Sequence, residues 1–191
     1  MSGKEDLRVK RTKKALTDAF IKLLSEKSFE EITVNELCDA AGVRRATFYK
    51  HYNDKFDFLT AYTRTLRDKF DSSVWKSTTP AQPKEYYIAY ARSLVMFVDA
   101  NAVAVANMLK SNIFPTMFTI ILEQNYRDTC KRLEASSAAG MPLAASVEVI
   151  ASMAAGAVAA AVYVWIVEGR KKSAEEIADE IGKVVHSLMD K

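Results

Sequence analysis

A chain of 191 residues with 49% apolar and 27% charged residues has the composition of an ordinary globular protein and not of a disordered one. Its 6 glycines, 4 prolines and 2 cysteines exclude the many turns of a β-sandwich and a disulfide framework. The net charge of +3 is too small to indicate a nucleic-acid partner by itself. The first residues lack the apolar run of a signal peptide, so we expect a cytoplasmic protein.

The predicted helices begin close to the N-terminus. Apolar residues recur at helical spacing over 8–27 and form one stripe, which predicts an amphipathic helix. Thr33 and Glu36 have the spacing of a capping box, which predicts that a short second helix starts there. Gly42 is the residue type that most readily takes the left-handed conformation after a helix. We therefore expect the second helix to stop at Gly42.

A third helix is expected over 45–52, and Asn53 is expected to cap a long fourth helix. The stretch SSVWKSTTPAQPKE at 72–85 collects serine, threonine and two prolines, which favours a linker between two domains. Later helices are predicted over 85–100, 102–111, 113–136, 143–169 and 173–189. No alternation is long enough to predict a strand. The expected fold class is all-α, with a first domain at 8–68 and a second at 69–191.

One helix of the second half carries no charge. The run VIASMAAGAVAAAVYVWIV at 149–167 reaches the length of a membrane span. It is rich in alanine and glycine and is bracketed by Glu148 and Glu168, which suits a close contact between helices better. We therefore expect a buried helix interface and no membrane partner. Ser173 and Glu176 predict a second capping box, at the start of the last helix.

Helix, tight turn and short helix within 33–52 are the layout of a helix-turn-helix motif, whose second helix enters the major groove of DNA. Phe48 and Tyr52 share one side of the third helix, which predicts that they pack inward. The opposite side and its flanks carry Arg45, Ala46, Thr47, Tyr49 and Lys50. Arginine and lysine donate to guanine edges, and a methyl group suits thymine. The alternative is a small helical module with an incidentally basic surface.

The flanks of this motif suit phosphate groups. Thr33 and the backbone N–H groups that follow it predict an anion site, as does the start of the fourth helix beside Lys55. Tyr49 and His51 can donate to phosphate oxygens without selecting a base. A second basic run, RVKRTKK at 8–14, would also face an anionic partner, although such runs are most often solvated surface.

The stretch ITVNELCDAAGVRRATFYKHYNDKFDFL resembles the DNA-binding domain of the TetR family of bacterial transcriptional regulators. The shared features are a T-V-x-x-[LI]-x-x-x-A-G-V run, then T-F-Y-x-H-Y, then D-K, within a similarity that covers about 10–65. The resemblance implies groove contacts from the third helix and phosphate contacts around it. The expected DNA-binding residues are Thr33, Val34, Arg44, Arg45, Ala46, Thr47, Tyr49, Lys50, His51 and Lys55. Arg44 and Arg45 stand where many members carry other residues, so the operator cannot be read from the family.

The end of the chain resembles the family less closely. YVWIVEGRKKSAEEIADEI is similar to the W-[IL]-x-x-G and S-x-E-E-[IL] ending of one subgroup. This resemblance implies a homodimer formed through the helices at 143–169 and 173–189, with the other helices around a small-molecule effector. The few charged groups there favour a hydrophobic effector. Its candidate contacts are Phe97, Met108, Tyr126, Tyr163 and Trp165, although aromatic residues at helical spacing belong to the core more often than to a pocket.

The sequence carries no nucleotide-binding glycine loop, no zinc-protease motif and no nucleophile elbow, so we expect no enzyme, cofactor or metal site. Cys130 is a lone thiol beside two basic residues. The expected function is a sequence-specific, DNA-binding transcriptional regulator, a repressor that a small molecule releases from a pseudo-palindromic operator. The alternatives are an activator, an architectural DNA-binding protein without an effector, and a helical carrier or enzyme.

Overall fold

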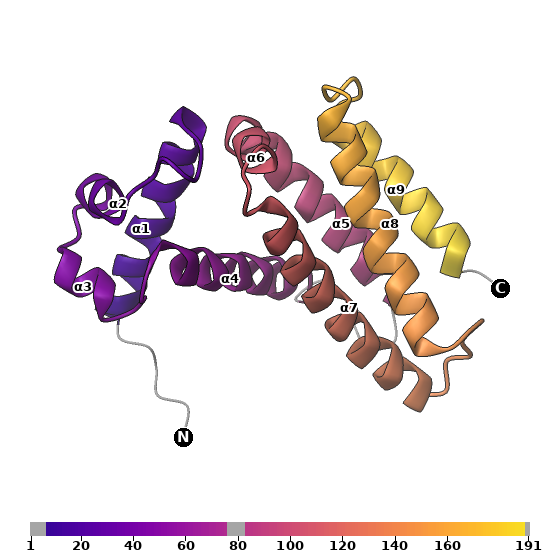
Figure 1. Ribbon diagram of the computed structural model, residues 1–191. Helices are drawn as coiled ribbons and strands as arrows, with labels where there is room; N and C mark the ends of the chain where they lie inside the picture. Colours follow the sequence, from indigo (N-terminus) through magenta and orange to yellow (C-terminus); the bar gives the residue numbers. More distant parts are fainter. Residues whose placement is uncertain (1–6, 76–82, 190–191) are drawn as a thin grey trace. The chain divides into compact units, whose positions relative to one another are not determined.

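A computed structural model describes residues 7–75 and 83–189 (Figure 1). Within these residues the chain forms helices and no strand, which confirms the all-α prediction. The helices are α1 (Leu7–Glu26), α2 (Val34–Ala41), α3 (Arg45–Tyr49), α4 (Lys55–Trp75), α5 (Pro83–Ala100), α6 (Ala102–Leu109), α7 (Phe114–Ala138), α8 (Val147–Val167) and α9 (Ala174–Met189).

The chain divides into two compact units. The first unit contains residues up to Thr65 together with Asn101–Phe114, so that α6 belongs to it although it follows α5 in the sequence. The second unit contains Leu66–Ala100 and the residues from Pro115 onward. In the first unit α6 packs against α1, and the Asn107 side-chain amide donates to the Leu24 carbonyl near the end of that helix (2.9 Å).

Aromatic rings fill the core of the first unit. The ring of Phe58 on α4 lies 5.4 Å from that of Phe20 on α1 and 6.1 Å from that of Phe48 on α3. Phe29 in the turn after α1 joins them through Phe20, at 6.2 Å. All four side chains are essentially inaccessible to solvent. Edge-to-face and tilted contacts of this kind add to the free energy gained by burying the rings, and they fix α3 on α1 and α4.

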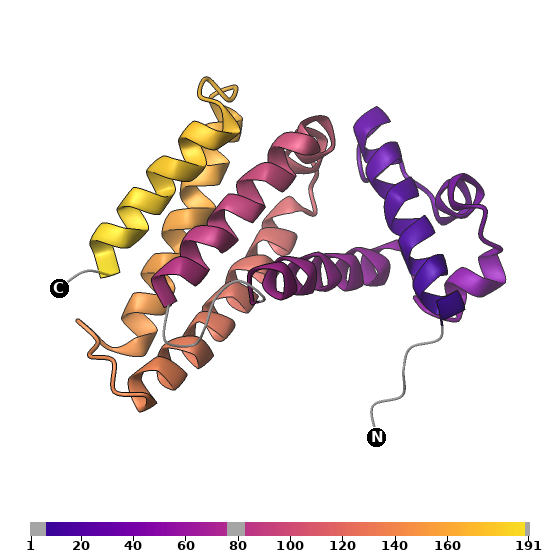
Figure 2. The ribbon, with the colours of Figure 1, turned by 180° about the vertical axis from the view of Figure 1, so that it is seen from behind.

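The second unit is organised around the contact between α5 and α9, which lie side by side (Figure 2). Gly182 on α9 allows this approach, because a Cβ atom there would lie 3.2 Å from Cγ2 of Ile88 on α5. Tyrosines join α5 to α7: the Tyr90 hydroxyl donates to Asn125 Oδ1 (2.8 Å), and the Arg132 guanidinium lies 3.7 Å from the Tyr86 ring centroid. These groups tie the helices together; Tyr86 is buried in the core and Tyr90 is half-buried.

Helix α8 has two apolar faces. Ala151, Ala155, Val158, Val162 and Trp165 follow each other at helical spacing and are buried in the unit. The Trp165 indole N–H donates to the Lys172 carbonyl (2.9 Å). The other face exposes Val149, Met153, Tyr163, Val164 and Val167. Among the described helices α8 is long and apolar enough to cross a membrane, but a core helix of a soluble protein has the same length and composition.

Most predicted helix boundaries agree with the structure to within a few residues. Helix α3 ends at Tyr49 and not at residue 52, because the chain continues as a tighter turn in which the His51 N–H donates to the Phe48 carbonyl. The predicted linker at 72–85 is partly helical, since α4 extends to Trp75 and α5 starts at Pro83. Its centre, 76–82, lies outside the described residues.

Candidate nucleic-acid interface

The start of α2 is fixed by the predicted capping box. The Glu36 N–H donates to the Thr33 hydroxyl oxygen (3.2 Å), and the Thr33 N–H donates to Glu36 Oε2 (2.9 Å). The Lys27 ammonium hydrogen-bonds the other carboxylate oxygen of Glu36. These hydrogen bonds, above all the one from Lys27, stabilise the ionised Glu36 carboxylate and lower its pKa to about 2. The cap therefore keeps its charge over the whole physiological pH range.

Gly42 forms the turn between α2 and α3. Its φ of 63° and ψ of 30° lie in the left-handed region, where a side chain is strained. The Gly42 N–H donates to the Asp39 carbonyl (3.1 Å) and the Val43 N–H to the Cys38 carbonyl (2.9 Å), the pair of bonds of a Schellman motif. Because nothing lies within 4 Å of a Cβ atom at this position, the backbone conformation alone selects glycine.

Helix α3 presents opposite faces to the core and to solvent, as its sequence predicts. Phe48 is fully buried and Tyr52 is nearly so, with their ring centroids 5.3 Å apart. Tyr49 is 49% exposed, and its ring packs edge-to-face with that of Phe48, with the ring centroids 5.4 Å apart. The exposed residues of this segment are Arg44, Arg45, Ala46, Tyr49 and Lys50, and Thr47 and His51 are half-buried. The outer face therefore offers cations, a methyl group and hydroxyls on one short rigid helix.

Thr33 is exposed and Val34 is half-buried at the start of α2. With the residues of α3 and with Lys55 at the start of α4, all ten predicted DNA-binding residues lie in the first unit. None of them is buried. The structure places them on one helix-turn-helix segment and the helix that follows it, and contact with DNA stays a prediction for each.

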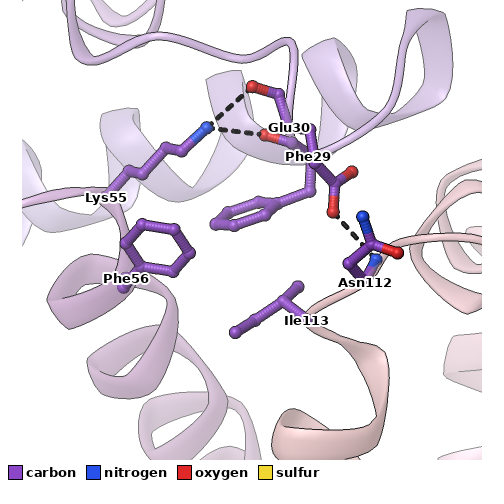
Figure 3. Close-up of a pocket in the computed structure, with 6 residues that line it drawn as sticks. All are labelled: Phe29, Glu30, Lys55, Phe56, Asn112 and Ile113. Carbon is purple, nitrogen blue, oxygen red and sulfur yellow. Dashed lines mark hydrogen bonds between the residues drawn. The ribbon is translucent and has the colours of Figure 1, made fainter.

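Lys55 is bound within the first unit (Figure 3). Its ammonium donates to the carbonyls of Phe29 (3.1 Å), Glu30 (2.9 Å) and Ile32 (2.9 Å), all in the turn between α1 and α2. It also lies 4.8 Å from the centroid of the Phe29 ring. An ammonium has three N–H donors, so these bonds use its whole capacity. This geometry holds the start of α4 against the turn, a position that the sequence-based assignment to phosphate did not anticipate.

The predicted anion site at the start of α4 is already filled by a side chain of the protein. Asp54 Oδ1 accepts hydrogen bonds from the Phe56 and Asp57 N–H groups, both at 2.8 Å. Asp54 is therefore the N-cap, where we had expected Asn53, whose N–H instead donates to Asp57 Oδ2 (2.9 Å). The aspartate takes the backbone donors that a phosphate would have used.

Glu30 connects the turn before α2 to the turn after α6, within the first unit. Its Oε1 accepts hydrogen bonds from the Ser111 hydroxyl (2.7 Å) and the Asn112 N–H (2.9 Å). The bond from Ser111, in particular, lowers the pKa of Glu30. These residues border a recess of about 290 Å³, lined by Phe29, Glu30, Lys55, Phe56, Asn112 and Ile113 (Figure 3). Sequence reasoning did not identify Glu30 or Ser111, because neither belongs to a motif and they lie 81 residues apart.

The five candidate effector contacts lie in different environments. Met108 is buried in the first unit. In the second unit Trp165 is buried, Tyr163 is 43% exposed on the other face of α8, and Phe97 and Tyr126 are half-buried. The pKa of Tyr126 is raised, mainly by a hydrogen bond with the Cys130 side chain. Their role toward an effector stays a prediction.

Comparison of the sequence with known proteins finds similarity to one family in the N-terminal part of the chain. Residues 16–62 match the sequence model of "Bacterial regulatory proteins, tetR family". The chain is 34% identical over 98 residues to the uncharacterized HTH-type transcriptional regulator YxbF of Bacillus subtilis (strain 168). This similarity covers 50% of the chain but spans only 25% of that relative.

Solved structures resemble the chain over nearly its whole length. A TetR-family transcriptional regulator from Syntrophomonas wolfei str. Goettingen has a TM-score of 0.75 and 16% identity, covering 94% of this chain and 95% of its own. FadR from Bacillus subtilis, crystallised in complex with stearoyl-CoA, has a TM-score of 0.66 and 16% identity, covering 92% and 98%. At these identities the similarity is one of fold.

Proposed function

We propose that the protein is a DNA-binding transcriptional regulator of the TetR family, because residues 16–62 match the model of this family of bacterial regulatory proteins. In this proposal it acts as a cytoplasmic homodimer, represses from a pseudo-palindromic operator and is released by a hydrophobic small molecule. The observation that carries the proposal is α3, whose outer face combines Arg45, Ala46 and Lys50 on a helix held from within by Phe48. The role is one of binding and not of catalysis.

The residues of α3 divide between reading bases and holding the backbone. Arg45, with Ala46 and Thr47, faces the groove in this proposal, where arginine can make paired hydrogen bonds to guanine. Tyr49 and His51 donate to phosphate groups, as does Thr33 at the start of α2. Arg44 and Lys50 add positive charge on either side, and Val34 lies at the edge of the contact.

Selection of duplexes from a random library, followed by fluorescence titration, tests this proposal. A regulator should prefer a pseudo-palindromic site by at least ~10³-fold over random DNA. Arg45→Ala should reduce that preference, whereas Tyr49→Phe should weaken binding to all duplexes alike. Strong salt-dependent binding without any preferred site would favour the architectural alternative, and a lack of DNA binding at moderate salt would favour a carrier or enzyme.

The exposed apolar face of α8 supports the homodimer. Val149, Met153, Val164 and Val167 follow a helical stripe on a helix that has no charged residue between Glu148 and Glu168. A two-fold axis would bring two such stripes together and remove them from water, and α9 adds the exposed Val184. The proposed interface is formed by α8 and α9 of both subunits.

Sedimentation velocity tests the dimer with two matched substitutions. Val167→Glu places a charge in the stripe, and Val103→Glu places one on α6, where the valine is equally exposed (61% and 60%). If the stripe joins two subunits, Val167→Glu should raise the dimer dissociation constant by a factor of about 100 or more, because each dimer buries two such carboxylates. Equal behaviour of the two variants would contradict this interface.

The effector is proposed to be hydrophobic. The second unit is rich in aromatic and aliphatic side chains, and the structurally similar FadR was crystallised with stearoyl-CoA. The candidate contacts in the second unit are Phe97, Tyr126, Tyr163 and Trp165, and Met108 of the first unit stays a separate candidate. Titration with stearoyl-CoA and with free fatty acids, monitored by thermal unfolding and by release of the selected duplex, tests this part. An effector should both stabilise the protein and release the DNA.

A further inference from the structure

The first two turns of α1 extend beyond the core of the first unit. No residue from Leu7 to Ala15 is buried, and the first buried side chain of the helix is Leu16. Five of the residues in these turns are basic and none is acidic: Arg8, Lys10, Arg11, Lys13 and Lys14. Short helical segments are marginally stable in water, and here no buried side chain adds stability. Packing in the core of the unit therefore does not account for these basic residues.

The charges of these turns are also placed unfavourably. The N-terminal end of a helix carries a partial positive charge, and each cation near it costs about 0.3–1 kcal/mol at low ionic strength. Most other helices in the described residues follow the favourable rule, with acidic first-turn residues such as Glu36, Asp57 and Glu148. Among these helices, α1 and α3 are the two whose first turn carries basic and no acidic side chains. Both belong to the first unit.

We propose that the first two turns of α1 bind the phosphate backbone of DNA beside the groove that α3 enters. Figures 1 and 2 both show the start of α1 at the end of the first unit where α3 lies. Arg8, Lys10 and Arg11 are exposed there. Lys14 forms an ion pair with Asp18 (2.5 Å). The proposed phosphate contacts are those of Arg8, Lys10 and Arg11, the exposed cations nearest the start of the helix. Negative phosphates would relieve the repulsion among these cations and between them and the helix end.

This inference rests on the proposed function, and it adds a contact outside the helix-turn-helix segment. The added contact is independent of base sequence, because lysine and arginine recognise phosphate groups by charge. Its signature is therefore the dependence of affinity on salt. Each phosphate contact contributes about −0.9 to the slope of log K against log salt concentration. Three contacts in each subunit should flatten the slope by about 2.7 per bound subunit when they are removed.

The test compares two triple variants with the unmodified protein on one labelled duplex recovered by selection and on one random duplex. The first variant, R8A/K10A/R11A, removes the proposed contacts and keeps good helix formers. The second, K131A/K171A/K183A, removes three exposed lysines from the second unit and leaves the same net charge. Circular dichroism should show that both variants remain folded, since every substituted side chain is exposed.

We expect only the α1 variant to lose affinity, by the same factor on both duplexes, and to show the flatter slope. If the unmodified protein binds the selected duplex and the α1 variant keeps both its affinity and its salt slope, this inference is wrong while the proposed function stands. Equal losses in the two variants would also overturn it, because net charge would then explain them. If the unmodified protein binds no duplex, the proposed function fails and the inference fails with it.

Discussion

Replacing Lys55 with methionine distinguishes a structural role of this side chain within the first unit from a contact with a DNA phosphate. The structure gives its ammonium three carbonyl partners, of which those on Phe29 and Ile32 are half-buried and that on Glu30 is exposed. A hydrogen bond to a charged group contributes about 1.5–3 kcal/mol, and water can replace the exposed one. The two half-buried bonds give about 3–6 kcal/mol, from which roughly 1.5–2 kcal/mol of lysine rotamer entropy is subtracted. We expect Lys55→Met to lower the free energy of unfolding by about 1–4 kcal/mol.

Two measurements decide between the roles. The midpoint of urea unfolding should shift by roughly 0.5–2 M for a loss of this size. Binding to DNA should weaken because α4 and the preceding turn are held less firmly, but the slope of log K against log salt should be unchanged. Lys50→Met is the matched control, since Lys50 is exposed on α3 and its loss should leave stability within about 0.5 kcal/mol. Unchanged urea unfolding of Lys55→Met, with a slope flatter by about 0.9 per subunit, would refute the structural role and support a phosphate contact.

The remaining predictions concern the helix ends and the turn after α6. Gly42→Ala should lower the free energy of unfolding, measured in urea, by about 1–2 kcal/mol, because the backbone at this position is left-handed. Gly42→Asn should lower it less, and equal stability of all three proteins would contradict this reasoning. Since the folded pKa of Glu36 is about 2 and its usual value is 4.5, its stabilising effect is complete above pH 4.5 and lost as the pH falls toward 2. The difference in melting temperature between the unmodified protein and Glu36→Gln should therefore be present at neutral pH and narrow at acid pH. Glu30→Ala should lower the free energy of unfolding by about 1–3 kcal/mol, because it leaves the buried Ser111 hydroxyl without this acceptor. Adding Ser111→Ala should recover part of the loss. Purely additive effects of the two substitutions would argue against the hydrogen bond between Glu30 and Ser111.

Features fixed by neighbouring residues could be predicted from the sequence. The Thr33 and Ser173 capping boxes each join residues three positions apart, and both form as predicted. Gly42 turns the chain because its own backbone conformation requires glycine. The inward side of α3 follows from the spacing of Phe48 and Tyr52. In each case the interacting groups lie within one or two helical turns, where spacing determines which residues meet.

Features that depend on distant residues could not be predicted in this way. The carbonyl partners of Lys55 lie 23 to 26 residues before it, and nothing in the local pattern distinguishes a lysine bound inside the unit from one directed at a phosphate. The packing of α6 against α1 is also invisible in the sequence, since apolar spacing identifies a buried face without naming its partner. Asn53 and Asp54 are equally good cap residues, and the backbone path selected the second.

The first unit is built from two separate segments of the chain, residues up to Thr65 and Asn101–Phe114. This affects how the unit folds during synthesis and which residues a chimera has to exchange. Asn107 and Ser111 supply hydrogen bonds that this unit lacks until these residues have left the ribosome, so its folding cannot be completed while only the helix-turn-helix segment has emerged. A chimera that exchanged only residues up to Thr65 would separate the helices proposed to contact DNA from the segment that completes their scaffold. Under the proposed function, exchange of DNA specificity between two related proteins should therefore transfer residues 101–114 together with the N-terminal part.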